Sequence, residues 1–238
     1  MDPYLYGDVP VLRNRLGIKD ESELITVEAQ ILIANLLNFD TALQIDNIFD
    51  VNAIRLIHQY LFGDLYDWAG DFRTVDIFKE EKVLDGQSVM YSRAKSIKES
   101  LTKTLDWAFT INWDYTNPSL TSCFAELMAR LWRVHPFREG NTRTISVYMK
   151  LFSKYHQLSF NDQLLSQNSS YLRAALVMAS IDEYSETQYL ERIIGDALSS
   201  SKKLTDSIST STSTTYKVIK SHIVDNDEEI PFSVKDKE

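Results

Sequence analysis

Two segments of helical periodicity are joined by the nine residues His135-Pro136-Phe137-Arg138-Glu139-Gly140-Asn141-Thr142-Arg143. Before this loop, apolar residues recur at helical spacing between Ser119 and Val134, and Pro136 favours an end of that helix near His135 because it has no N–H to donate. After the loop, the apolar spacing predicts a second helix from Thr144 to Tyr155, with Asn141 as its cap. The sequence therefore predicts helix, tight loop, helix.

The residue types in this loop suit the transfer of a phosphate-containing group. The first N–H groups of a helix have no partner within the helix and carry partial positive charge, so they form an anion site. Gly140 allows a phosphate to approach the backbone, Arg143 adds a charged contact, and Glu139 is suited to hold Mg²⁺ between phosphates. His135 can accept a proton from a hydroxyl. The residues alone are equally consistent with an ordinary helix–helix turn that contains a structural histidine.

The loop resembles the signature of the Fic (Fic/Doc) family, His-Pro-Phe-x-Asp/Glu-Gly-Asn-Gly-Arg-x-x-Arg. It departs from that signature at Thr142, where the family usually has glycine, and at Ser146, where it usually has the second arginine. Arg138 holds a variable position of the signature and is expected to be solvated. A second resemblance, from Leu61 to Ile77, matches the stretch before the family's substrate-binding flap, and the resemblance as a whole covers about residues 4–198.

The resemblance implies a role for each matching residue. His135 is expected to be the general base that deprotonates a Ser, Thr or Tyr hydroxyl of a target protein, and Glu139 is expected to bind Mg²⁺ between the α- and β-phosphates of ATP. The expected members of the anion cradle are Gly140, Asn141, Thr142 and Arg143. Asn141 is placed at the α-phosphate and Arg143 at the β-phosphate. The implied reaction leaves AMP on the hydroxyl and releases pyrophosphate.

The hydrophobic period changes between residues 72 and 85. Phe72 to Phe78 is rich in β-branched and aromatic residues, Lys79 to Lys82 is polar enough for a turn, and Val83 and Leu84 resume the apolar pattern. This pattern predicts a short β-hairpin, and an exposed strand edge can accept an extended peptide. The resemblance implies that this hairpin, the flap, holds the target through Thr74, Val75, Asp76, Ile77, Phe78 and Lys79. The alternative is a surface hairpin without a partner.

The remaining chain favours one helical domain followed by a tail. Helices are expected from Glu21, capped by Asp20, from Val51 to Phe62, and from Ser88 to Phe109. His58 falls on or beside the apolar face of the second of these helices and is expected to be a core histidine.

Residues 1–198 are assigned to a Fic domain, with a core of about 50–198 and a helical lead-in of 1–49. Residues 199–238, rich in Ser and Thr and then acidic, are predicted to be a flexible tail. The expected fold class is mainly α: a Fic-fold helical bundle with a short β-hairpin flap.

Composition limits the partners of this chain. Its 238 residues carry a formal net charge of −9, which argues against nucleic acid or an anionic membrane surface as the main partner. No apolar stretch approaches the ~20 residues needed to span a bilayer, and the N-terminus does not resemble a signal peptide. The single cysteine, Cys123, cannot form an internal disulfide, which favours a reducing compartment and a cytoplasmic location.

The sequence thus predicts a protein adenylyltransferase (AMPylase) that uses ATP and Mg²⁺ and docks its target protein at the flap. Because Thr142 and Ser146 depart from the signature, other donors stay open, such as those of a phosphotransferase or a phosphocholine transferase. A third interpretation is a weakly catalytic toxin or binding module under the control of a small antitoxin, as in some bacterial relatives.

Overall fold

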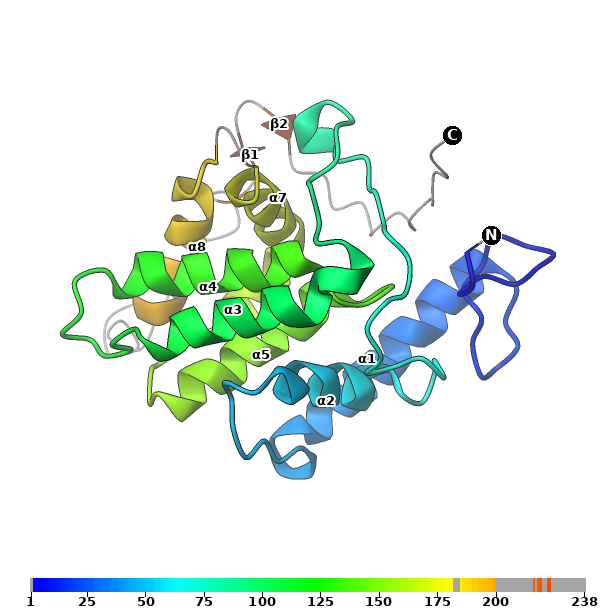
Figure 1. Cartoon of the computed structure of the whole chain (residues 1–238), viewed down its shortest axis with the longest axis horizontal. Coiled ribbons are helices and arrows are strands. Elements are labelled where there is room, and N and C mark those ends of the chain that lie inside the picture. The colour runs from blue at the N-terminus through cyan, green and yellow to red at the C-terminus, as the bar shows by residue number, and fades with distance from the viewer. Residues whose placement is uncertain (1, 182–184, 200–215, 217, 220–221, 224–238) are drawn as a thin grey trace.

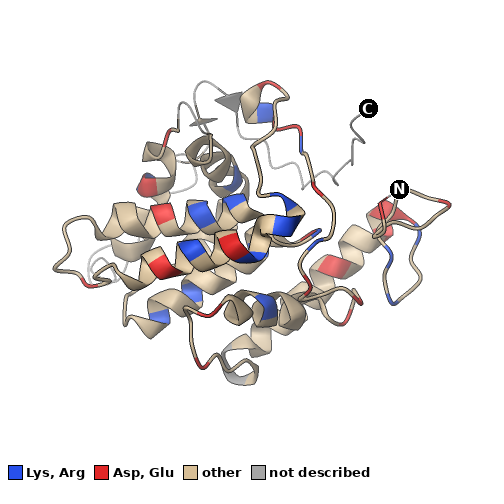
Figure 2. Ribbon diagram, in the orientation of Figure 1, with Lys and Arg blue, Asp and Glu red and all other residues tan. Residues whose placement is uncertain are grey.

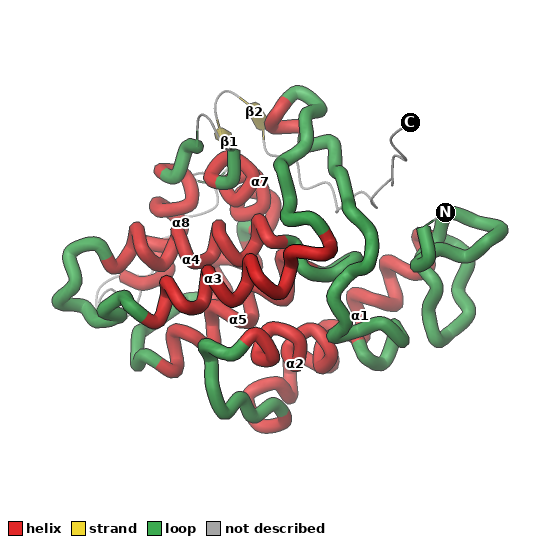
Figure 3. The backbone as a smooth tube through the Cα atoms, in the orientation of Figure 1, coloured by secondary structure: helices red, strands yellow, loops and turns green. Residues whose placement is uncertain are grey.

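The computed structural model describes residues 2–181, 185–199, 216, 218–219 and 222–223. This part is a bundle of α-helices from which α1 projects, with the N-terminal segment at its far end (Figure 1, Figure 3). No helix in it is long and apolar enough to cross a membrane. The elements, in chain order, are α1 (Glu21–Ala42), α2 (Val51–Phe62), η1 (Lys82–Leu84), η2 (Ala94–Ser96), α3 (Ile97–Phe109), α4 (Leu120–Val134), α5 (Asn141–Tyr155), α6 (Asp162–Gln167), α7 (Ser169–Ala179), α8 (Gln188–Ser199), β1 (Val218–Ile219) and β2 (His222–Ile223).

The centre of the bundle is α4, which packs against α3, α5, α7 and α8. Phe124, Leu127, Met128 and Leu131, at the i, i+3, i+4 and i+7 positions of one helix face, have an exposed fraction of 0%. Each such side chain contributes about 1.5–3 kcal/mol when it is fully buried. The predicted pair of helices around the loop and the mainly α fold are confirmed.

The predicted flap lacks strand pairing in the structure. Among the described residues of this region, the backbone bonds that join the two arms run from Glu81 N–H to the Gln87 carbonyl and from Gly86 N–H to the Glu81 carbonyl, both at 3.0 Å. At Lys79 the N–H donates to the Ser88 side chain, Oγ, at 3.1 Å, and not to a backbone carbonyl as in a β-ladder. The predicted β-hairpin is therefore wrong as secondary structure, although the chain does turn back on itself through η1.

The helix predicted to begin at Ser88 begins later, with η2 and then α3 at Ile97. The residues before it run extended because the chain is tied to the motif region: the Ser92 carbonyl accepts from the Arg73 guanidinium, and Ser92 N–H donates to the Arg133 carbonyl at 3.4 Å. Helices α1 and α2 begin at Glu21 and Val51, where the sequence predicted them. Asp20 is the predicted cap of α1, because its side chain accepts from Glu23 N–H at 2.9 Å.

The tail predicted for residues 199–238 lies largely outside the described residues. Of the part that is described, Tyr216 and Ile219 are buried. The Tyr216 hydroxyl donates to the Asp196 carboxylate on α8, and its ring lies 4.8 Å from that of Tyr171 on α7. These two tail residues therefore pack on the domain, contrary to the expectation for a flexible tail, and the domain boundary near residue 198 stays a prediction.

Arg138 is buried, not solvated as the sequence suggested. Its guanidinium donates to the Asp2 carboxylate at 2.9 Å, and both side chains have an exposed fraction of 2%. The Asp2 carboxylate also accepts from Tyr4 N–H at 3.0 Å. The contact ties the first residues of the chain to the loop between α4 and α5, across 136 positions of sequence.

The Arg138–Asp2 pair gives a prediction about stability. Arg138→Met leaves the Asp2 carboxylate buried without this cation, so we expect a loss of about 3–5 kcal/mol in the free energy of unfolding, measured with urea. The matched control is Arg15→Met, which breaks the exposed pair with Asp67, at exposed fractions of 51% and 83%, and is expected to cost at most about 1 kcal/mol. Equal losses in the two variants would contradict the assigned role of the buried pair.

Candidate active site

His135 ends α4 in a conformation that few residues adopt. Its φ of 49° and ψ of 61° lie in the left-handed region, which costs a non-glycine residue roughly 1–2 kcal/mol. The His135 N–H donates to the Trp132 carbonyl at 3.0 Å, and ring Nδ1 lies 3.2 Å from the same oxygen. The side chain is 2% exposed. The imidazole is thus fixed at the point where the chain leaves the helix.

The environment of His135 keeps its ring neutral. Burial lowers its pKa well below 6.5, and the positive charges of Arg173, Arg73 and Lys79 act in the same direction. A carbonyl accepts only, so the bond to Trp132 places the ring proton on Nδ1 and the lone pair on Nε2. A neutral imidazole with a basic Nε2 is the form that a general base requires.

Arg73 lies within the Leu61–Ile77 stretch that resembles the family, and the structure shows what it contacts. Its buried side chain donates to the His135 carbonyl at 2.8 Å, to the Val75 carbonyl at 2.7 Å and to the Ser92 carbonyl. Its backbone N–H donates to the Pro136 carbonyl at 2.9 Å. Burial lowers the pKa of Arg73 to about 10, so the guanidinium stays charged at neutral pH. Arg73 therefore joins the loop after α4 to both arms of the flap.

His58 holds the other end of the same loop and is the buried core histidine that the sequence predicted. Its Nδ1 accepts from Gly70 N–H at 2.8 Å, so its Nε2 is the donor in the 3.1 Å contact with the Glu139 carbonyl. Its ring stacks on Phe137 at 3.8 Å. Burial lowers its pKa to about 3, so His58 is a neutral, structural histidine.

Gly140, not Asn141, is the N-cap of α5, and Asn141 is the first residue of the helix. The Asn141 amide closes the loop: Oδ1 accepts from Phe137 N–H at 2.8 Å, and Nδ2 donates to the Phe137 carbonyl at 2.9 Å. Gly140 has a φ of 74°, and a Cβ at this position would lie 2.5 Å from the Phe62 ring. The predicted cap is therefore wrong by one residue, and glycine is required at 140 by both backbone and packing.

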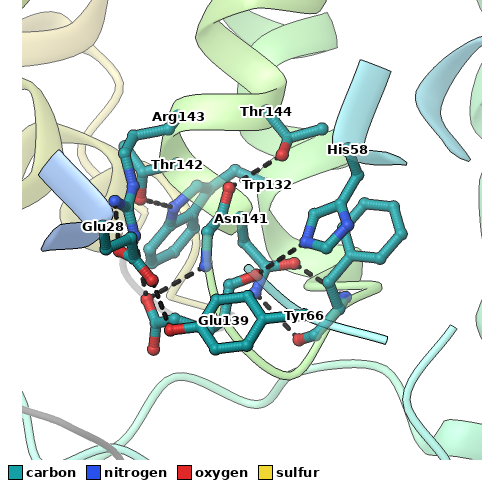
Figure 4. A network of polar contacts seen from close by, with 11 residues as sticks. Glu28, His58, Tyr66, Trp132, Glu139, Asn141, Thr142, Arg143 and Thr144 are labelled. Carbon is teal, nitrogen blue, oxygen red and sulfur yellow. Dashed lines mark hydrogen bonds and ion pairs between the residues drawn. The ribbon is translucent and has the colours of Figure 1, made fainter. Parts of the chain in front are cut away.

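Arg143 lies among carboxylates on the first turn of α5. One guanidinium nitrogen is 2.5 Å from the Glu28 carboxylate of α1, and another is 3.5 Å from Glu139 (Figure 4). The second oxygen of Glu28 accepts from the Tyr66 hydroxyl at 2.5 Å. Sequence reasoning missed Glu28 and Tyr66, because no local pattern indicates that α1 reaches the motif.

Thr142, the first departure from the family signature, has a structural partner. Its hydroxyl accepts from the Trp132 indole N–H at 2.9 Å, which ties the start of α5 to the last turn of α4 (Figure 4). Thr142 also lines the cavity described below. The second departure, Ser146, lies one turn further along α5 than Arg143 and is half-buried.

A cavity of about 480 Å³ opens beside these residues, between α1, the N-terminal segment and the start of α7. Its polar end contains Glu28, Glu139, Thr142 and Arg143, while Leu24 and Leu32 of α1 belong to its apolar wall. The structure thus brings Glu139 together with two of the predicted cradle residues, Thr142 and Arg143, at one end of a pocket of a size suited to a small organic ligand, whereas Gly140 and Asn141 do not line it.

The carboxylate of Glu139 fits one ligand of a magnesium ion shared with phosphates, but not a metal site made by protein alone. The described residues include no group of three or more His, Cys, Asp or Glu side chains that would hold a metal ion. Mg²⁺ in phosphate-transfer sites is commonly bound by one or two carboxylates and by the substrate's phosphates. One Glu139 oxygen accepts from Gly140 N–H at 2.9 Å, which orients the carboxylate.

The predicted flap residues alternate between buried and exposed, as in an extended strand. Ile77 and Lys79 are buried and Val75 is half-buried, whereas Thr74, Asp76 and Phe78 are exposed. The ends are held in place: Thr74 N–H donates to the Tyr4 hydroxyl at 3.0 Å, and Asp76 accepts from Ala94 N–H at 2.6 Å. The segment therefore presents every second side chain outward without belonging to a sheet.

Gly140 gives a prediction with an internal control. Gly140→Ala is expected to be less stable than Gly17→Ala by about 1–3 kcal/mol, because only at 140 does the new methyl group meet a buried ring. Both glycines have a positive φ, 74° and 71°, and Gly17 has no neighbouring atom within 4 Å of the added Cβ. Urea unfolding of both variants checks the difference, and equal destabilisation would show that the contact with Phe62 is not restrictive.

Comparison with known proteins agrees with these features. The model of the Fic/DOC family matches residues 48–153. "Probable protein adenylyltransferase y4lH" of Sinorhizobium fredii is 30% identical over 157 residues, which are 65% of this chain and 76% of that protein. "Protein adenylyltransferase VbhT" of Bartonella schoenbuchensis is 32% identical over 149 residues, 62% of this chain. The match spans only 30% of the length of VbhT.

Solved structures share the fold at lower identity. The BepC protein of Bartonella tribocorum, solved with bound AMPPNP, has a TM-score of 0.66 and 22% identity, covering 82% of this chain and 95% of that one. The N-terminal FIC domain of Bep8 from Bartonella sp. 1-1C has a TM-score of 0.68 and 19% identity, covering 84% and 96%. With the motif loop, the helices on either side of it and these similarities together, the chain belongs to the Fic/DOC family.

Proposed function

We propose that this protein is an adenylyltransferase that moves AMP from ATP to a Ser, Thr or Tyr hydroxyl of a target protein. One observation carries the proposal. A neutral, buried His135 stands at one end of the loop, and the N-terminus of α5, with Glu139 and Arg143, stands at the other end. Arg73 and His58 hold the two ends in place by donating to the carbonyl groups of His135 and Glu139. The relatives y4lH and VbhT, both named as adenylyltransferases, support the same reaction.

The proposed step is a substitution at phosphorus. Nε2 of His135 accepts the proton of the target hydroxyl, and the hydroxyl oxygen forms a bond to the α-phosphorus of ATP. The bond from that phosphorus to the oxygen bridging to the β-phosphate breaks, and pyrophosphate leaves. The product carries AMP on the target side chain.

The nucleotide is assigned to the cavity between α1 and the start of α5. Its phosphates lie at the N-terminus of α5, where the N–H groups of the first turn and the Arg143 guanidinium favour negative charge. Because Arg143 now contacts Glu28 at 2.5 Å, a phosphate has to compete with that carboxylate for the guanidinium. When bound, Mg²⁺ at Glu139 neutralises phosphate charge.

The target is assigned to the flap, Thr74 to Lys79. This segment is extended, and its alternate side chains Thr74, Asp76 and Phe78 face outward. An extended peptide that runs beside it can bond to main-chain groups and present its hydroxyl to His135. A small antitoxin chain is a further proposed partner.

A second candidate is the same fold with another donor. The observation that favours it is Ser146, which stands one turn after Arg143, where the family usually supplies a second arginine. Without that charge, the site has less affinity for a γ-phosphate, so ATP is less strongly favoured over a donor with fewer phosphates. A phosphotransferase or a phosphocholine transferase is the concrete form of this alternative.

Labelled ATP separates these proposals. The protein is incubated with cell lysate and ATP labelled at the α- or the γ-phosphate. We expect label on protein from the α position only, as AMP transfer requires. Label from the γ position only would contradict the proposal and favour phosphotransfer, and no label from either position would favour a binding module or a different donor.

His135→Ala is expected to lower α-label transfer by a factor on the order of 10²–10⁴, the usual effect of removing a general base. His135→Asn is the companion variant, since asparagine tolerates the left-handed backbone at this position. ATP affinity by calorimetry and the melting temperature are expected to stay near those of the wild type. Unchanged transfer in both variants would remove His135 from the mechanism.

A further inference from the structure

A second hollow, of about 370 Å³, lies beside the last turn of α4, the helix that ends at His135. It is formed by Met90–Ser92, by Ser100 and Thr104 of α3, and by Arg130, Arg133 and Val134 of α4. We call it the α3–α4 hollow. It shares no lining residue with the cavity that contains Arg143. The two hollows are therefore separate sites on the described part of the protein.

The α3–α4 hollow borders the proposed base. Tyr91, one of its lining residues, places its ring 4.1 Å from the His135 imidazole, and Val134 directly precedes His135 in the chain. The segment Met90–Ser92 is also the continuation of the flap, since Arg73 bonds to the Ser92 carbonyl as well as to Val75. A target peptide that follows the flap toward His135 therefore reaches this hollow with a residue close to its modified hydroxyl.

The chemistry of the α3–α4 hollow is cationic and hydrogen-bonding. Arg133 lines it and donates from Nε to the Met90 carbonyl at 3.4 Å, and the Ser92 hydroxyl, also in its lining, donates to the Ser100 hydroxyl at 3.2 Å. Arg130 is held in place by Glu126 at 2.5 Å and by the Trp107 ring at 4.3 Å.

This positive charge is local, because the chain as a whole carries −9. Arg93, Lys95 and Lys98 lie within six residues of Ser92, in a run whose acidic residue is Glu99. Figure 2 shows blue segments at η2 and along the second half of α4, and α3, which continues η2, packs against α4. Concentrated positive charge on an otherwise acidic protein attracts an acidic partner surface.

We propose that the α3–α4 hollow binds an Asp or Glu side chain of the target protein next to the modified hydroxyl, an assignment that rests on the proposed transferase function. The carboxylate accepts from the Arg133 guanidinium and from the Ser100 hydroxyl, which itself accepts from Ser92, and Met90 covers the stem of the side chain. The hollow thus selects targets whose acceptor Ser, Thr or Tyr has acidic neighbours.

Fluorescent peptides test the inference without the transfer reaction. The probes are Glu-Gly-Glu-Thr-Glu-Gly-Glu and the matched peptides with Gln or Lys in place of each Glu, titrated with the full chain and followed by anisotropy. We expect the Glu peptide to bind about tenfold or more tightly than the Gln peptide, and more weakly as salt is raised. Arg133→Gln is expected to remove most of that preference, and Arg133→Glu to move it toward the Lys peptide.

The matched control is Lys19→Gln, an exposed cation in a pair with Asp8 near the N-terminus, which is expected to leave the preference intact. Melting temperature and ATP titration report whether each variant is folded. Equal binding of the three peptides by the wild type, or equal effects of Arg133→Gln and Lys19→Gln, would overturn the proposal.

The same peptides separate the failure of this inference from failure of the transferase proposal. If the wild type binds the Glu peptide selectively but moves no α-label from ATP to any protein or peptide, the acidic-side-chain site stands and the donor assignment fails. If α-label reaches proteins and the three peptides are labelled equally, transfer stands and the hollow does not select acidic targets.

Discussion

The contact on which the site depends most is the one between the Arg73 guanidinium and the carbonyl of His135, at 2.8 Å. His135 adopts a left-handed backbone that costs roughly 1–2 kcal/mol, and it persists because its surroundings leave no relaxed alternative. Arg73 is buried and charged, and its donors also hold the Val75 and Ser92 carbonyls. One side chain therefore holds both the backbone at His135 and the flap beside it.

The rest of the loop is fixed by neutral groups together with the buried Arg138–Asp2 pair. His58 donates to the Glu139 carbonyl. The Asn141 side-chain amide accepts from the Phe137 N–H and donates to the Phe137 carbonyl. These bonds hold the turn before α5 in place without a bound ligand. Such rigidity suits a site that works by positioning and electrostatics, since groups that are already placed need not reorganise during the reaction. In the proposed mechanism the loop separates two functions, with the base at His135 and the anion site at the start of α5.

The sequence predicted what is local and missed what joins distant segments. Apolar spacing with Pro136 and Gly140 gave α4 and α5 to within three residues at each end, because helix periodicity and chain-breaking residues act over one or two turns. No such pattern indicates that Glu28 reaches Arg143, or that Asp2 neutralises Arg138. The β-branched and aromatic residues of the flap predicted a hairpin, but Lys79 N–H donates to the Ser88 hydroxyl where a strand ladder would offer a carbonyl.

The most direct test of the account is the protonation state of His135, because a base must be neutral with its lone pair on Nε2. Ring nitrogen chemical shifts of the ¹⁵N-labelled protein report it, with His135→Ala to assign the signals. The account predicts a neutral ring with the proton on Nδ1 at pH 7, and no protonation until the pH is well below 6.5. A charged ring at pH 7, or a proton on Nε2, would contradict the assignment of His135 as the base.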